Sequence, residues 1–464
     1  MNSINMKINL CEHFEWIKLY RFPITRSNDE TYYECIEHWL AKYIGDLENC
    51  QYVPSSVIDM IKQYTCGILG SLKRYYYGDI LNAYKLFYDA VSSVKSNLKY
   101  TIIGESPTHR GCYVPYFRII SLYDSPFDYK AMLHIPYNKK SIIPQYRFSV
   151  SGIPCSYMSS SPLVSWYETG MPDRYQLARF DATNRTEKLL ALDINAQDEY
   201  FKICRSDATV SEVWKVLSNT IFTLPLTAFC SVVKNDDGSK FIEEYVIPQM
   251  LMSWVLSETD VIGIRYQTNK RFEFGRCISA YNVALPATQE DSDHYSKNLK
   301  QIFAIDDMEN QDHNKKCKLW TITVADEIEH KYGKKIQVLS EFYERILEEY
   351  KHKKVPKIFK DYLGITRIVL SNVMFFQRKK NETNSNSEKK YTALVTLKSL
   401  LPWIDKVKDE SSNLTIRISH NGCTMNQDEI HTATQIIEYF QKSIYEILID
   451  ICDMDYSLLE LKYI

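Results

Sequence analysis

The segment from residue 113 to residue 168 combines two arginines, a tyrosine and a carboxylate with short apolar runs. Arg118 lies in Tyr-Phe-Arg-Ile and Arg147 lies in Tyr-Arg-Phe-Ser. Tyr157 follows in Gly-Ile-Pro-Cys-Ser-Tyr-Met-Ser, and Glu168 ends Ser-Trp-Tyr-Glu. Turn residues separate these runs. Because a buried core does not need ionised side chains, their ordered occurrence indicates a binding or catalytic pocket.

These side-chain types suit the cleavage of a dinucleotide at its nicotinamide–ribose bond. The planar guanidinium of arginine binds a diphosphate through paired hydrogen bonds. A tyrosine ring stacks on a flat base, and its hydroxyl makes one orienting hydrogen bond. A carboxylate near the ribose stabilises the positive charge that develops as nicotinamide leaves. The set is therefore sufficient to split NAD as a substrate, without a metal or a separate cofactor.

The same stretch resembles the RES domain, a bacterial family named for its arginine, glutamate and serine, over about residues 105–285. The resemblance implies a fold close to that of ADP-ribosyltransferases and an activity that consumes NAD. Arg118 matches the first arginine of the family, and Glu168 matches the glutamate that begins a helix. Arg147 stands in the position of a Gly-Arg-Trp motif, although its neighbours here are Tyr146 and Phe148.

The resemblance also assigns the remaining parts of the pocket. Residues 152–159 match a glycine turn and strand that carry Tyr157 and Ser159, and Thr268 stands where a serine is expected. Tyr137, in His-Ile-Pro-Tyr, either lines the pocket or is structural. The implied catalytic residues are Glu168, Arg118 and Tyr157. The implied NAD-binding residues are Arg118, Arg147, Tyr137, Tyr157, Ser159 and Thr268.

Each of these residues also has a structural interpretation. Either arginine could pair with a surface carboxylate, and Tyr157 could be a core residue. Glu168 could be an acid in the first turn of a helix, where the helix dipole favours it. His134 could contact phosphate, but a hydrogen-bonded structural histidine is the more common case. The co-occurrence of the four residues in one segment favours a functional site.

Other catalytic classes lack their motifs. The chain of 464 residues has only 14 glycines and contains no glycine-rich phosphate loop. It has neither G-x-S-x-G nor H-E-x-x-H, and its 12 cysteines include no C-x-x-C pair, so no metal site is predicted. A net charge of −2 argues against a nucleic-acid partner. We expect no membrane span and no signal peptide, and hence a cytoplasmic protein with reduced thiols.

Periodicity predicts an α+β protein with flanking helical regions. Residues 1–104 are expected to be helical, with helices at 56–64 and 80–94. Within 105–285, helices are expected at 210–220 and 242–256. Short β-rich runs predict strands at 100–103, 116–120, 146–150, 189–192 and 263–266. Residues 286–318 are polar and predict a linker, and 319–464 predict a mainly helical C-terminal domain.

The final predicted helix carries an apolar face at steps of three and four residues, formed by Ile430, Ala433, Ile437, Phe440, Ile444, Ile447 and Ile451. Such a face packs either on its own domain or on a second copy of the chain. The latter would make the protein a homo-oligomer through this helix.

The sequence therefore predicts an NAD-degrading enzyme, a glycohydrolase or phosphorylase. It would act as a toxin or phage-defence effector controlled by an antitoxin or a sensor protein. Two alternatives remain: an ADP-ribosyltransferase that modifies a protein or nucleic acid, and a non-catalytic nucleotide-binding module.

Overall fold

The structure is a computed structural model that describes residues 12–27, 29–106, 113–121, 125, 127–170, 172, 174–183, 185–193, 209–234, 241–268, 281–305, 318–323, 338–348, 363, 366, 428 and 431–440. The chain divides into two compact units. Unit 1 comprises Met1–Arg118, Phe127–Ser160 and Ala178–Lys318; unit 2 comprises Ile119–Pro126, Ser161–Leu177 and Leu319–Ile464. We describe each unit by itself.

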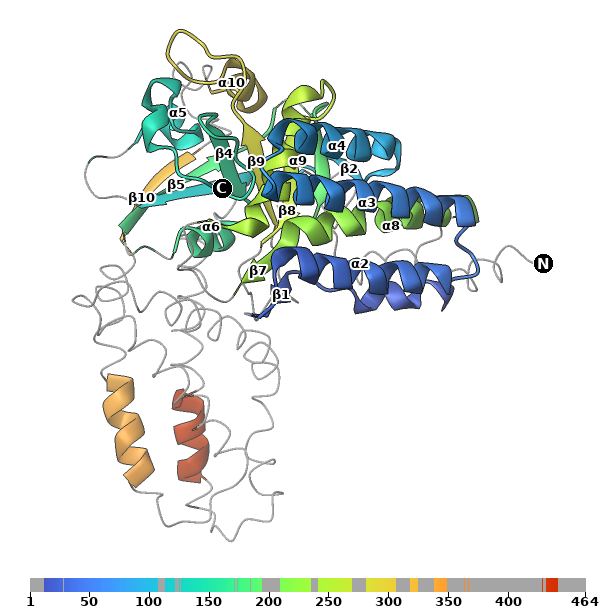
Figure 1. The fold of residues 1–464 in the computed structure, drawn as a ribbon. Coiled ribbons are helices and arrows are strands. Elements are labelled where there is room, and N and C mark those ends of the chain that lie inside the picture. The colour runs from blue at the N-terminus through green and yellow to red at the C-terminus, as the bar shows by residue number, and fades with distance from the viewer. Residues whose placement is uncertain are drawn as a thin grey trace. The chain divides into compact units, whose positions relative to one another are not determined.

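Unit 1 contains a layer of helices that lie side by side (Figure 1). They are α2 (Tyr32–Glu48), α3 (Ser55–Tyr76) and α4 (Ile80–Ser93), followed by α8 (Val210–Ser231) and α9 (Val246–Ser257). Capping boxes begin α2 at Thr31 and α8 at Thr209. The helices predicted at 56–64, 80–94, 210–220 and 242–256 are thus confirmed as α3, α4, α8 and α9.

Helix α8 is buried on all sides along residues 220–231, although Pro225 interrupts its hydrogen bonding. Proline has no backbone N–H, so the Ile221 carbonyl loses its helical donor. The Tyr43 hydroxyl of α2 donates to that carbonyl at 2.6 Å. Tyr64 of α3 donates to the Phe222 carbonyl, also at 2.6 Å. Two outer helices are therefore fixed to α8 where its own ladder is broken.

Tyr43→Phe is expected to lower the free energy of unfolding by about 1–3 kcal/mol, since it leaves the buried Ile221 carbonyl unpaired. The change keeps the ring and its packing. Urea unfolding measures the loss. Tyr33→Phe is the matched control, because the Tyr33 hydroxyl bonds to Glu37 at the exposed surface of the same helix. Equal stability of the two variants would show that the Tyr43 bond does not support α8.

A mixed sheet packs beside these helices, with the strand order β10-β5-β3-β4-β9-β8-β6-β2 among the described residues. The strands are β2 (Tyr100–Ile102), β3 (Tyr116–Ser121), β4 (Cys155–Ser159), β5 (Arg174–Phe180), β6 (Lys188–Leu192), β8 (Gly263–Gln267), β9 (Tyr281–Pro286) and β10 (Lys318–Thr323). The β6–β8 pair is parallel, whereas β4–β9 and β8–β9 are antiparallel. Strands β6, β8 and β9 share one apolar core with the helices.

A separate parallel pair joins β1 (Ile24–Arg26) to β7 (Val232–Lys234), directly after α8. Arg26 anchors it through a buried ion pair with Glu244, with 2.8 Å between Nη2 and Oε1. Helices and strands thus alternate in one core, which confirms the α+β class. None of the helices in the part of the chain that the structure describes is long and apolar enough to cross a membrane.

The prediction of a strand at residues 146–150 is wrong. The Ser149 hydroxyl lies 2.9 Å from both the backbone nitrogen and the carbonyl oxygen of Tyr146, which folds this segment into a turn. The predictions at 100–103, 116–120, 189–192 and 263–266 are confirmed as β2, β3, β6 and β8. Within the predicted linker, residues 286–305 carry the short helix α10 (Lys297–Phe303).

In unit 2, helix 338–348 and helix 431–440 pack on each other. The Phe440 ring is fully buried, with its centroid 5.3 Å from that of Phe342 and 6.2 Å from that of Tyr343. Ile437 is also fully buried. The described part of the predicted self-association face is therefore covered within the chain. Ile430, Ile444, Ile447 and Ile451 lie outside the described residues.

Candidate functional site

Arg118 is the centre of the candidate site. It lies on β3, is partly exposed, and donates from Nη1 to the Leu133 carbonyl oxygen. The described residues give it no carboxylate partner, and burial lowers the pKa of its guanidinium. By contrast, Arg26 pairs with Glu244 and Arg265 pairs with Asp193 at 2.8 and 2.9 Å. Arg118 thus carries a positive charge for which the described residues offer no counter-ion.

The Leu133 carbonyl fixes this cation to the neighbouring strand. Leu133 ends the short helix α5 (Tyr129–Leu133), where helical carbonyls lack intrahelical donors. Its oxygen also accepts a hydrogen bond from the Ser156 hydroxyl of β4 at 2.6 Å. The Leu133 carbonyl oxygen therefore accepts hydrogen bonds from both the Arg118 guanidinium and the Ser156 hydroxyl of β4.

Tyr157, also on β4, has a buried hydroxyl without a hydrogen-bond partner among the described residues. Burial, and then the neighbouring Cys155 thiol, raise the pKa of this hydroxyl. Burial likewise raises the pKa of Cys155, to about 12, and so keeps the thiol protonated. An unpaired buried hydroxyl costs about 1–3 kcal/mol.

The Tyr146 ring packs against Tyr157, with the ring centroids 4.9 Å apart and the planes at 57°. Burial raises the pKa of Tyr146, and the charge of Arg118 opposes this rise. Tyr146 and Tyr157 are therefore in contact, and the charge of Arg118 on β3 acts on both hydroxyls.

His134 follows Leu133 and is fully buried. Its Nε2 accepts a hydrogen bond from the Ser296 backbone N–H at 2.9 Å, and its Nδ1 lies 2.8 Å from the Ile135 carbonyl oxygen. Because Nε2 is an acceptor, the ring is neutral and carries its proton on Nδ1. Burial lowers the pKa of His134 to about 4. The structural interpretation of His134 is therefore favoured over phosphate contact.

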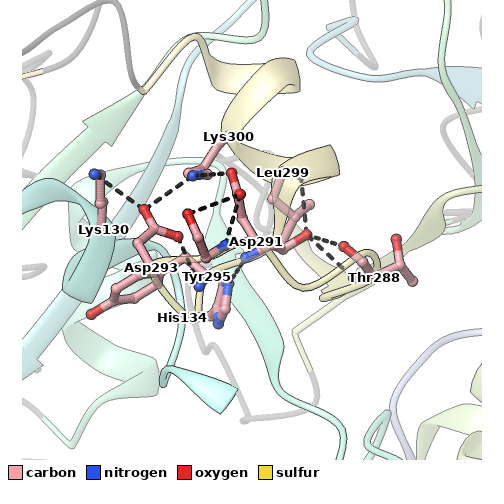
Figure 2. A network of polar contacts seen from close by, with 10 residues as sticks. Lys130, His134, Thr288, Asp291, Asp293, Tyr295, Leu299 and Lys300 are labelled. Carbon is pink, nitrogen blue, oxygen red and sulfur yellow. Dashed lines mark hydrogen bonds and ion pairs between the residues drawn. The ribbon is translucent and has the colours of Figure 1, made fainter. Parts of the chain in front are cut away.

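The loop at residues 291–296, whose Ser296 N–H binds His134, is held in place by ion pairs (Figure 2). Lys300 of α10 is almost fully buried and pairs with Asp291 at 2.7 Å and Asp293 at 3.0 Å. Lys130 of α5 reaches Asp293 at 3.2 Å. Burial alone would raise the pKa of Asp293, but hydrogen bonds from Lys300, the Tyr295 backbone and Lys130 outweigh it and set the pKa at about 2.

Stability should therefore depend on pH through His134. Above about pH 6.5 the neutral ring keeps its contacts. As the pH falls from 6.5 to 4, the unfolded chain takes up a proton that the folded chain resists, which removes roughly 3 kcal/mol. Asp293 loses its contribution only between about pH 4 and 2. Urea unfolding across pH measures the slope, and His134→Gln should flatten it between pH 4 and 6.5. An equal slope in the variant would contradict this assignment.

Arg147 lies in different surroundings from Arg118. Its Nη1 donates to the Cys230 carbonyl at 3.2 Å and to the Glu244 carbonyl at 3.3 Å. Its guanidinium also lies 5.0 Å from the centroid of the Tyr245 ring. Arg147 thus binds a backbone carbonyl in the last turn of α8. None of these contacts joins Arg147 to Arg118 or Tyr157. A role for Arg147 in binding NAD stays a prediction.

The other predicted binding residues also have their own contacts. The Ser159 hydroxyl donates to Asn282 Oδ1 across the β4–β9 pair at 2.7 Å. Thr268 is buried directly after β8. Tyr137 begins the 3-10 helix η3 (Tyr137–Ile142), and its ring meets His134 edge-on at 5.9 Å. Of the predicted site residues, Arg118 and Tyr157 thus lie within electrostatic reach of each other.

Glu168 is the last residue of α6 (Pro162–Glu168), in unit 2. The helix begins with Ser161, whose hydroxyl accepts from the Val164 N–H at 3.2 Å, and left-handed Gly170 follows its end. Glu168 therefore does not begin a helix, and its interpretation as a first-turn acid is wrong. A carboxylate at the C-terminal end opposes the helix dipole, so helix stability does not account for this residue.

Sequence reasoning missed Tyr146, Ser156 and the Leu133 carbonyl. Tyr146 had a signal, because it adjoins Arg147 in the quoted motif. A backbone carbonyl has none, since every residue carries one. Within the described residues, no group of three or more His, Cys, Asp or Glu side chains is placed to hold a metal ion.

Comparison with known proteins gives one informative similarity. Over 308 residues the chain is 28% identical to a protein of Bacillus subtilis (strain 168) named "Putative toxin YopC". The alignment covers 61% of this chain and 67% of the relative. No family model matches the chain. No solved structure matches it. The chain is thus similar to a protein named as a toxin.

Proposed function

We propose that the chain is a toxin that degrades NAD and releases nicotinamide, with an ADP-ribosyltransferase-like RES fold. In the reaction, the bond between ribose C1′ and the nicotinamide nitrogen breaks, and its electron pair leaves with nicotinamide. Water then attacks C1′ and loses a proton, which yields ADP-ribose. The similarity to a protein named as a toxin supports the toxic role. The resemblance in residues 105–285 supports the choice of NAD.

The observation that carries the proposal is Arg118, a partly buried cation that lies within electrostatic reach of Tyr157. A partly buried guanidinium without a carboxylate partner is costly unless an anion binds it. Among the described residues, Arg118 donates one hydrogen bond, to the Leu133 carbonyl oxygen. Its other guanidinium N–H groups can therefore bind a diphosphate. The buried Tyr157 hydroxyl, which has the Cys155 thiol as its neighbour, can make one hydrogen bond to the same ligand. A dinucleotide supplies both an anionic diphosphate and hydroxyl groups.

We assign Glu168 the stabilisation of the ribose cation, as the resemblance implies. The chain then needs no second cofactor, because nicotinamide is the leaving group and water the acceptor. A permanently active enzyme of this kind would kill its host, so we extend the proposal to a protein partner that inhibits it, such as an antitoxin.

Controlled expression in a bacterial host tests this function. NAD content should fall before growth stops, and Glu168→Gln should grow normally with unchanged NAD at the same protein level. Growth arrest with constant NAD content would indicate a toxin with a different target. Macromolecules carrying ADP-ribose would instead indicate a transferase.

A further inference from the structure

We infer that Tyr146 contacts the substrate, by stacking its ring on a planar heteroaromatic ring of the nucleotide that binds at Arg118. The inference rests on the proposed function for the identity of that nucleotide. The heteroaromatic ring is either adenine or nicotinamide, since both belong to NAD.

Tyr146 presents an accessible ring at the candidate site. Its side chain is 44% exposed although it packs against Tyr157 at 4.9 Å. The Tyr157 hydroxyl, by contrast, is buried. Tyr146 therefore forms the outer aromatic surface of the pair. Aromatic side chains stack on any base, because every base has a π-face, and such a contact contributes strongly to binding.

The backbone of Tyr146 is fixed by hydrogen bonds. The Ser149 hydroxyl bonds to both its nitrogen and its carbonyl oxygen at 2.9 Å. The Gln249 side chain of α9 also donates to that carbonyl at 3.2 Å. A ring held on such a turn loses little conformational entropy when it binds a ligand. This arrangement favours a recognition role over that of a loosely held surface residue.

The charge beside the ring specifies the ligand class. The charge of Arg118, which has no carboxylate partner among the described residues, acts on Tyr146, whose ring contacts that of Tyr157. A ligand that satisfies both must join an anionic group to a flat ring. A nucleotide has this composition. Tyr88 of α4 is 41% exposed and lies outside the candidate site, which makes it a matched control.

Calorimetric titration of the full chain with NAD, AMP and nicotinamide mononucleotide tests the inference. Tyr146→Phe should bind NAD within about twofold of wild type, whereas Tyr146→Leu should bind it roughly tenfold more weakly. Tyr88→Leu should leave binding unchanged. A parallel loss for AMP identifies adenine as the stacked ring, and a parallel loss for nicotinamide mononucleotide identifies nicotinamide. Leucine keeps an apolar side chain of similar bulk, and thermal melting verifies that each variant is folded.

NAD binding by folded Tyr146→Leu within twofold of wild type would overturn the inference and leave the proposed function intact. Tight NAD binding by wild type without nicotinamide release would instead contradict the proposed function, while the loss in Tyr146→Leu would still support stacking. Absence of NAD binding by the wild-type chain would overturn both.

Discussion

Glu168→Gln is expected to lower the turnover number for NAD by about 100-fold or more, with little change in KM. The amide keeps the shape of the carboxylate but removes the charge that stabilises the ribose cation in the transition state. Nicotinamide release by the purified variant measures the effect.

Glu341→Gln is the control for a surface carboxylate, because Glu341 is exposed on helix 338–348. It should leave turnover unchanged. Near wild-type turnover for Glu168→Gln would remove this residue from the mechanism.

Arg118→Met is expected to weaken NAD binding roughly 10- to 100-fold, because it removes charge-assisted hydrogen bonds to the diphosphate. Its melting temperature should be equal to or higher than that of wild type, since an apolar side chain replaces a partly buried cation without a described counter-ion. Calorimetry and thermal melting measure the two quantities.

Arg147→Met is the matched comparison for thermal stability. Arg147 donates to the Cys230 and Glu244 carbonyls, so its loss should lower the melting temperature. Destabilisation by Arg118→Met with unchanged NAD affinity would show that Arg118, too, is structural.

The sequence correctly predicted the elements whose apolar residues follow a regular helical or strand spacing. Helices α3 and α4 and strands β3 and β8 all lie where apolar spacing placed them. The segment 146–150 misled because its residues have high β propensity. Its structure depends on the Ser149 hydroxyl, which offers the backbone of Tyr146 an alternative to strand pairing.

The candidate site was predicted only in part. Arg118 and Tyr157 are unusual in apolar strands, and the structure places them near each other through β3 and β4. The acceptor that holds Arg118 was not predictable, because the Leu133 carbonyl is a backbone group. Lys300, Asp291 and Asp293 looked like residues of a solvated linker until the fold placed them around the loop that holds His134.

The measurement that tests the central claim most directly is incubation of the purified chain with NAD labelled in the nicotinamide ring. We predict that labelled nicotinamide is released with time. Glu168→Gln should release it more slowly by a factor of about 100 or more. A parallel reaction with adenine-labelled NAD should leave its label in small molecules. NAD that stays intact in the presence of the folded wild-type protein would contradict the account.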